Sequence, residues 1–394
     1  MRGAALSDLH LGFRAFPATI DGRNAREVDV EHAWAAAVQQ VIDAQPDLVT
    51  IAGDVVHHPR VGTHAVKAWR DGVRRIVEET TAHVIVIQGN HDAGRTAEVL
   101  TPIVLPDDLP RVHIVTEPRR IHVETPTGVA AVACFPFVSR GNGEAYKLEP
   151  DPEADVNVLL MHAAVKGSAD GDTLPYFYGG GDEALDIGRE ADRWDVVAVG
   201  DYHEFTRLHP SRLAFYSGSI ERTSSNIWVE HAPKGWVLYD TDTGEMEFRE
   251  VPTRGMHDDA LEGDPAGPVT TAAAVNDRLA KISANEGHQD SIVRLRVDQF
   301  PRDERADVDW ALVRELKRSC LHFYLDLRFR ARATEELGDR RDRKVSSLAE
   351  EFAAFFALDE EAVRRIAERY LELEAEAEDL AESSPERELE ESVA

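Results

Sequence analysis

One pattern recurs along the first half of the chain: a short apolar run, then a polar turn, then a helix. The run at residues 84–87 is followed by Gly89-Asn90-His91-Asp92, a tight turn that carries an amide oxygen, an imidazole and a carboxylate. Repeated βα units of this kind form a largely parallel sheet, with the turns gathered at the carboxyl ends of the strands. The strands and helices of this pattern are predicted at residues 4–6, 31–44, 48–52, 63–79 and 84–87.

The middle and the end of the chain predict further layers. Residues 112–115, 121–123 and 129–134 are predicted as short strands of a second sheet. Later strands are expected at residues 156–161, 196–199, 214–220 and 235–239. From about residue 268, alternating helices and strands predict a small α/β module at residues 271–283, 291–297, 308–318 and 322–329. A charged linker at 331–343 precedes an amphipathic tail, so the predicted parts are residues 1–255, 266–331 and 344–394.

Metal-binding residue types follow five of the predicted strands. They are Asp8 with His10, Asp54, Asn90, His162, and Asp201 with His203. Each alone has an ordinary explanation, because Asp and Asn favour turns and helix caps and a lone His is usually a core residue. Five such strand ends in one chain are better explained by a metal centre.

The chemistry of these side chains indicates which metals to expect. Carboxylate, imidazole and amide oxygen together suit Mn, Fe or Zn better than Ca or Mg, which prefer all-oxygen ligands. Seven ligands are too many for one ion and fit two, with Asp54 as a bridging carboxylate. Two ions can clamp a phosphate and lower the pKa of a water, while His57 and His91 hold the phosphate or protonate the leaving group.

Composition sets limits on partners and location. The chain has a formal net charge of -29, which counts against broad nonspecific DNA affinity but leaves DNA possible as a substrate. Residues 344–394 hold 16 Asp and Glu against 5 Lys and Arg, so the acidity is concentrated there. No apolar run approaches 20 residues, the start has no signal-peptide pattern, and Cys134 and Cys320 are far apart. We therefore expect a cytoplasmic protein without a disulfide framework and without a membrane partner.

The spacing of these motifs resembles that of a known family. Asp8-x-His10, Gly53-Asp54-x-x-His57, Gly89-Asn90-His91-Asp92, His162 and Gly200-x-x-His203 together resemble the calcineurin-like metallophosphoesterases. The closer resemblance is to the SbcD nuclease subunit of the DNA double-strand-break repair complex. His57 stands three residues after Asp54 as in those nucleases, and residues 216–222 with 234–236 look like the segment that closes their nuclease domain.

The resemblance implies a fold, a cofactor and partners. The fold would be a four-layer αββα sandwich (1–255) with an α/β capping domain (266–331) and a helical ATPase-binding segment (344–394). The activity would be a DNA exonuclease and endonuclease with two Mn²⁺, with Fe, Zn and Mg as alternatives. The partners would be DNA and an SbcC-type ATPase, with a homodimer inside a heterotetramer.

The resemblance also implies roles for single residues. One metal would take Asp8, His10, Asp54 and His203, and the other would take Asp54, Asn90, His162 and residue 201. His91 would stabilise the transition state and His57 would position the substrate. The family has Gly-His-x-His where this chain has Gly200-Asp201-Tyr202-His203. Asp201 would either bind the second metal through oxygen, which we favour, or turn away from it.

Two further sets of residues are predicted to contact partners. Arg14, Arg95, Arg140 and Arg222 lie close in sequence to the metal-binding turns and are candidates for phosphate contacts, although each also fits an ordinary surface arginine. In the tail, a capping box at Ser347 and Glu350 opens the first of two amphipathic helices. Their apolar stripe is Leu348, Phe352, Phe355, Phe356, Val363, Ile366 and Tyr370.

The tail and the function each have alternatives. The apolar stripe packs either on this chain or, as we favour, on the coiled coil of the ATPase, because two short helices cannot bury their own apolar faces. The alternatives to a DNA nuclease are a phosphatase or cyclic-nucleotide phosphodiesterase of the same superfamily, and a weakly active scaffold subunit. The module and the tail argue against the small-substrate enzymes, and the change at Asp201 is the one observation that favours the scaffold.

Overall fold

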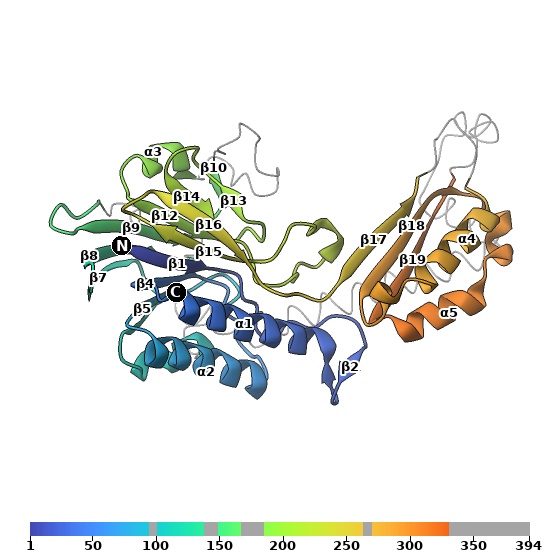
Figure 1. Ribbon diagram of the computed structural model, residues 1–394, viewed down its shortest axis with the longest axis horizontal. Helices are drawn as coiled ribbons and strands as arrows, with labels where there is room; N and C mark the ends of the chain where they lie inside the picture. The colour runs from blue at the N-terminus through green and yellow to red at the C-terminus, as the bar shows by residue number, and fades with distance from the viewer. Residues whose placement is uncertain (94–100, 138–148, 167–184, 263–269, 331–394) are drawn as a thin grey trace, which may run out of the picture. The chain divides into compact units, whose positions relative to one another are not determined.

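The computed structural model describes residues 1–93, 101–137, 149–166, 185–262 and 270–330 (Figure 1). The chain divides into two compact units, Met1–Phe329 and Arg330–Ala394. The predicted tail helices and the ATPase-binding stripe, from Leu348 to Tyr370, lie outside the described residues. The predicted limits of the three parts of the chain, at residues 255, 266, 331 and 344, stay predictions.

Two six-stranded mixed sheets form the main body of the first unit (Figure 1). The first has the strand order β16-β15-β1-β4-β5-β6 and the second β13-β14-β12-β9-β8-β7. The strands of the first sheet are β1 (Arg2–Leu6), β4 (Leu48–Ala52), β5 (His83–Ile87), β6 (Val112–Val115), β15 (Gly235–Asp240) and β16 (Glu245–Glu250). Those of the second are β7 (Arg119–Thr125), β8 (Gly128–Phe135), β9 (Val156–His162), β12 (Val196–Gly200), β13 (Thr206–Arg207) and β14 (Leu213–Tyr216).

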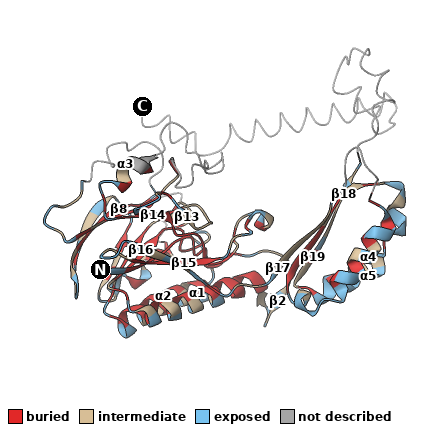
Figure 2. Cartoon of the chain, turned by 45° about the horizontal axis from the view of Figure 1, so that its top comes forward, coloured by how far each residue is buried: buried red, intermediate tan, exposed pale blue. Residues whose placement is uncertain are grey.

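Successive side chains of each strand point to opposite faces of its sheet, so one face packs on helices and the opposite face packs on the other sheet. In β4, Val49 and Ile51 face α1 (Ala25–Ala44) and α2 (Thr63–Glu79), whereas Leu48 and Ala52 face the second sheet. The outer face of the second sheet packs on α3 (Ile187–Ala191). Figure 2 shows the central strands of both sheets and the inner side of α1 as buried. The order helix, sheet, sheet, helix confirms the predicted sandwich.

Two local predictions were wrong. β6 was expected in the second sheet, but it pairs in parallel with β5 of the first, with Val84 opposite Val112. An apolar strand of four residues carries no signal for which sheet edge it joins. The first helix begins at Ala25 and not at residue 31, because Asn24 caps it and Arg26 and Asp29 are buried as an ion pair.

The predicted small module of helices and strands is present. It has three parallel strands in the order β17-β18-β19, which are β17 (Met256–Leu261), β18 (Ile292–Phe300) and β19 (His322–Phe329). Helices α4 (Ala272–Ser283) and α5 (Trp310–Ser319) share an apolar core with β18 and β19. β17 was not predicted, because its sequence Met-His-Asp-Asp-Ala-Leu has three adjacent polar residues and no alternation of polar and apolar residues.

Minor elements complete the described chain. They are β2 (Thr19–Ile20), β3 (Arg23–Asn24), β10 (Val165–Lys166), β11 (Leu185–Asp186) and the 3₁₀ helices at Pro102–Asp108, Ile227–Val229, Glu286–His288 and Asp303–Asp307. Among the helices that the structure describes, none has the length and apolar character that a membrane span requires.

Candidate metal centre

The predicted ligands meet where strands of the two sheets end. β1, β4 and β5 run parallel to each other, as do β9 and β12, so their carboxyl ends lie on common edges. The turn after β1 is tied to the turn after β4, because the backbone N–H of Asp8 donates to Gly53 O at 3.0 Å and that of His10 donates to Asp54 O at 2.9 Å. The order of the sheets thus brings segments that are distant in sequence to one place.

Several of these turn residues have left-handed backbones. The φ angles are 51° at Asp8, 47° at His10, 53° at Asp54 and 99° at Asp201. Residues other than Gly rarely adopt positive φ, and such positions concentrate at functional sites. These four backbone conformations lower the stability of the fold somewhat, and they set the directions of the four side chains.

Two glycines allow the turns to approach closely. A Cβ at Gly89 would lie 2.1 Å from Asp54 Oδ1, and one at Gly53, where φ is +83°, would lie 2.8 Å from Gly89 Cα. These distances are too short for any side chain. The place of Asp54 thus depends on glycine in two separate turns.

Replacement of Gly89 by Ala is expected to damage the centre. The new methyl group meets both Asp54 Oδ1 and the backbone N of Asp54, so Asp54 must move, at a cost of about 1–3 kcal/mol in unfolding free energy. Thermal unfolding and Mn²⁺ titration measure the two effects, and both stability and metal affinity should fall. Gly62→Ala is the control, because its Cβ would have only ordinary contacts, the nearest at 3.5 Å from Glu27 Oε1. Unchanged metal affinity in Gly89→Ala would contradict this assignment.

Asp8, His10 and His203 form the first group of possible ligands. Each offers one ligand atom within 4.8 Å of the others. The Nε2 atoms of His10 and His203 lie 3.0 Å apart, and Asp8 accepts from the backbone N of Asp201 at 3.2 Å. Burial, together with the neighbouring imidazoles, lowers the pKa of His10 well below its usual value. A neutral imidazole keeps the lone pair that a metal needs.

Asp54, Asn90, His162 and Asp201 form the second group. His162 Nε2 lies 2.9 Å from Asn90 Oδ1, 3.6 Å from Asp54 Oδ1 and 3.6 Å from Asp201 Oδ1. The other ring nitrogen, Nδ1, lies 2.7 Å from Ala52 O, which assigns it the proton. The Asp201 carboxylate thus faces the imidazole of His162, which also contacts Asn90 and Asp54.

Charges in this group call for a cation. Burial raises the pKa of Asp54 to about 7, and the nearby Asp8 and Asp92 contribute to the rise. Burial alone would lower the pKa of His162, but the carboxylates of Asp54, Asp8 and Asp201 outweigh it and raise the value to about 9. Here several buried carboxylates lie close together and keep a proton on an imidazole. A bound divalent ion would offset the repulsion among these carboxylates. The donor set therefore fits divalent metal ions.

His91 and His57 lie beside the ligand groups. The ring of His91 crosses that of His10 at 89° with centroids 4.8 Å apart, and it stacks on His57 at 5.3 Å. His91 Nδ1 lies 2.8 Å from His57 O, which fixes the ring and leaves Nε2 for a substrate. Burial and neighbouring imidazoles lower the pKa of His57 to about 4. His10, His57 and His91 also form a group whose ligand atoms lie within 4.8 Å of one another.

Asp92 ties two turns together. Its side chain is fully buried and accepts from Gly89 N at 2.8 Å and from Val56 N at 2.9 Å. These bonds use both carboxylate oxygens, so the geometry supports a role for Asp92 in orienting the turns and not in binding a metal.

A second set of supporting residues was not predicted. Glu230 Oε1 lies 3.5 Å from His203 Nδ1, and Lys234 forms a buried ion pair with Glu230. Ser224 Oγ is also 3.3 Å from His203 Nδ1. Lys234 lies in the segment 234–236 noted for its resemblance to the family, but no local motif marks Glu230 or Ser224, because they reach His203 only through the path of the loop between β14 and β15.

The candidate phosphate-binding arginines have different settings. The Arg14 side chain is 62% exposed, although its guanidinium pairs with Glu27 at 2.9 Å. The Arg222 side chain is only 12% exposed, and it donates to Glu230 O at 3.1 Å and to Thr253 Oγ1 at 3.0 Å. These contacts tie Arg222 to the fold, and a DNA contact stays a prediction for both. Arg95 and Arg140 lie outside the described residues.

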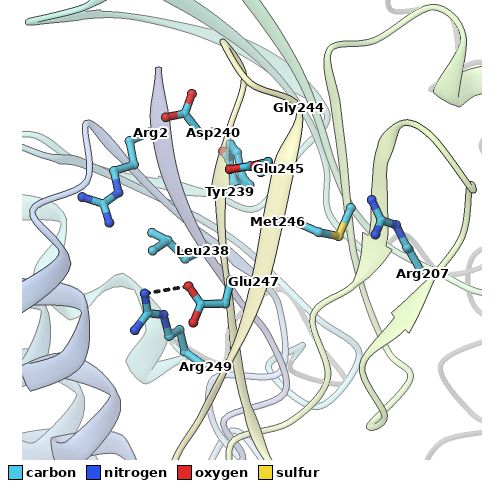
Figure 3. Close-up of a pocket in the computed structure, with 10 residues that line it drawn as sticks. All are labelled: Arg2, Arg207, Leu238, Tyr239, Asp240, Gly244, Glu245, Met246, Glu247 and Arg249. Carbon is cyan, nitrogen blue, oxygen red and sulfur yellow. Dashed lines mark ion pairs between the residues drawn. The ribbon is translucent and has the colours of Figure 1, made fainter.

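A pocket of about 540 Å³ lies elsewhere, on the edge formed by β15 and β16 (Figure 3). Its lining carries both charges: Arg2 lies near Asp240, Arg249 lies near Glu247, and Arg207 lies beside Met246. Glu247 and Arg249 form an ion pair at 2.7 Å. Because its charges are mixed and none of its lining residues is a candidate ligand, this pocket adds nothing to the metal centre.

Comparison with known proteins decides the family. The sequence pattern of the calcineurin-like phosphoesterase family matches residues 1–205, more than half of the 394 residues. The chain belongs to this family. The match contains both ligand groups, so the predicted family and the predicted enzyme class, a metal-dependent phosphoesterase, are confirmed.

Relatives are similar over part of their length. The DNA double-strand break repair protein Mre11 of Methanopyrus kandleri is 28% identical over 273 residues, which are 64% of this chain and 57% of that protein. The Mre11 of Archaeoglobus fulgidus is 24% identical over 298 residues, covering 67% and 62%. The crystal structure of TT1561 of Thermus thermophilus matches 64% of this chain and 99% of its own, with 15% identity and a TM-score of 0.38. The chain thus spans about three fifths of the length of the Mre11 relatives that it matches.

Proposed function

We propose that this phosphoesterase is a DNA nuclease that uses two divalent metal ions, with manganese as the preferred ion. The observation that carries the proposal is that the two oxygens of Asp54 face different imidazoles. Oδ2 lies 3.7 Å from Nε2 of His10, which is grouped with Asp8 and His203, and Oδ1 lies 3.6 Å from Nε2 of His162, which also contacts Asn90 and Asp201. The similarity to relatives named for DNA double-strand break repair supports DNA as the substrate.

The residues would divide the work as follows. Asp54 would be shared by both ions, with the two groups above completing each set. When bound, the ions would neutralise the phosphate and lower the pKa of the attacking water. His91 would donate a hydrogen bond or a proton from Nε2 to the phosphate, because Nδ1 is held by His57 O. His57, next to it, would position the substrate.

Asp201 replaces the imidazole of the family pattern, and we propose that it binds the second ion. Its Oδ1 faces His162 at 3.6 Å, which supports this over a side chain turned away. Replacement by Ala should weaken one Mn²⁺ site by about 10–100-fold and leave the other near its wild-type affinity. Calorimetric titration with Mn²⁺ resolves the two sites. Two sites of unchanged affinity in Asp201→Ala would mean that Asp201 is not a ligand.

The substrate can be tested directly. Hairpin-ended duplex DNA and a nitrophenyl phosphodiester are each incubated with the full chain in Mn²⁺, with a chelator as the blank. A nuclease cleaves the DNA, and the metal-free sample does not. Hydrolysis of the small ester alone would favour the alternative, a phosphatase or cyclic-nucleotide phosphodiesterase. Inactivity on both would favour the scaffold.

We further propose that an ATPase of the SbcC type binds the tail through the stripe from Leu348 to Tyr370, and that the complex contains a dimer of this chain. The amphipathic pattern of residues 344–394 supports the first part. Deletion of residues 344–394 should abolish co-purification with the ATPase and spare cleavage of the small ester. Co-purification that survives the deletion would contradict the assignment.

A further inference from the structure

The loop between β14 and β15 contains a buried ion pair that reaches the metal centre. The side chains of Glu230 and Lys234 are 3% and 0% exposed, and they pair with each other. Burial of two charges stabilises a fold poorly, because desolvation offsets their attraction. Stability alone therefore does not explain why this ion pair is buried.

The two ring nitrogens of His203 face different surroundings. Nε2 faces Nε2 of His10 at 3.0 Å, on the side of the first ligand group. Nδ1 lies 3.5 Å from Glu230 Oε1 and 3.3 Å from Ser224 Oγ. An acceptor at Nδ1 places the proton there and leaves the lone pair on Nε2. By contrast, Nδ1 of His162 and Nδ1 of His91 each face a backbone carbonyl.

Glu230 is itself held in place. Its Oε1 accepts from the backbone N of Ser224 at 2.7 Å, and its Oε2 pairs with Lys234. Lys234 also donates to His203 O at 2.9 Å and to Ser219 Oγ at 3.1 Å. One lysine thus fixes both the backbone of His203 and the carboxylate beside its ring.

We propose that Glu230 is a positioning residue that orients the imidazole of His203 toward the metal, with Lys234 as its anchor. Ligating histidines commonly donate their second N–H to a carboxylate, which fixes the ring and strengthens it as a ligand. The anchor holds this carboxylate beside the ring and also binds the backbone carbonyl of His203. The inference rests on the proposed metal centre and adds to it the residues that set one ligand.

The test compares metal binding with folding in the full chain. Glu230→Ala should weaken one Mn²⁺ site by about 10–100-fold. The double variant Glu230→Met with Lys234→Met removes both charges and the Glu230 acceptor near Nδ1, and its apolar side chains fill the same buried space, so it should fold and lose Mn²⁺ affinity to a similar extent. Mn²⁺ affinity and stoichiometry come from calorimetry and from the electron spin resonance of the free ion, and thermal unfolding is measured beside them.

Glu221→Gln is the matched control. Glu221 is equally buried and pairs with the buried Arg26 at 3.1 Å, so its loss tests the cost of disrupting a buried ion pair. This variant should lose stability and keep both Mn²⁺ affinities.

The outcomes separate the inference from the proposed function. Wild-type Mn²⁺ affinities in the double variant, and in Glu230→Ala if it folds, would overturn the positioning role alone. A wild-type protein that binds no Mn²⁺ or other divalent ion would overturn the proposed metal centre as well. If Glu230→Ala does not fold, the double variant decides.

Discussion

Replacement of His91 by Ala should lower kcat for phosphodiester cleavage by about 10²–10⁴-fold and leave Mn²⁺ binding intact. His91 Nδ1 is held by the carbonyl of His57, so its Nε2 is the group that can act on the phosphate. Its backbone N–H, which donates to Asp54 Oδ1 at 2.9 Å, survives the substitution. Single-turnover cleavage of hairpin DNA at saturating Mn²⁺ measures the effect.

The control for His91 is another histidine. His122 on β7 is half exposed and bonds to Asp151 at 2.7 Å, in the second sheet. His122→Ala should cleave like the wild-type protein. If His91→Ala keeps full kcat, or loses activity only because Mn²⁺ no longer binds, the catalytic role is wrong.

Replacement of Asp54 by Ala should remove both metal ions and with them all detectable cleavage. Asp54 Oδ2 lies 3.7 Å from His10 Nε2, and Oδ1 lies 3.6 Å from His162 Nε2, so its two oxygens face the two ligand groups. Loss of this carboxylate should lower Mn²⁺ affinity at both sites, whereas loss of Asp201 should lower it at one. Calorimetric titration with Mn²⁺ should give no site of wild-type affinity.

Folding of the Asp54 variant is checked by thermal unfolding without metal. The carboxyl is 2% exposed and sits near Asp8 and Asp92, so its removal also relieves repulsion among buried carboxylates. We expect the metal-free variant to be about as stable as the metal-free wild-type protein, while Mn²⁺ should raise the unfolding temperature of the wild-type protein only. A single Mn²⁺ site retained at wild-type affinity would show that Asp54 does not bridge.

The candidate ligands were predictable because they obey one rule of folding. In parallel sheets the polar residues that follow strands meet at one edge, so Asp8, Asp54 and Asn90 could be grouped from their order alone. His162 ends β9 and Asp201 follows β12, the neighbouring strand of the second sheet, as the short apolar runs before them predicted. The distances among these residues agree with that grouping.

The supporting residues were not predictable in the same way. Glu230 precedes Lys234 in an irregular loop, and its contact with His203 depends on how the whole intervening stretch of chain is folded. The early start of α1 was missed because Arg26 and Asp29 look like exposed residues, although partners distant in sequence, Glu221 and Arg254, pair with them. β6 was misplaced because strand pairing depends on the connection before it.

A crystal soaked with Mn²⁺ and measured at the manganese absorption edge tests the metal centre most directly. We predict two anomalous peaks on opposite sides of the Asp54 carboxylate, one near His10 and His203 and the other near His162 and Asp201. A single peak, or two peaks with Asp54 bound to neither, would contradict the two-metal centre.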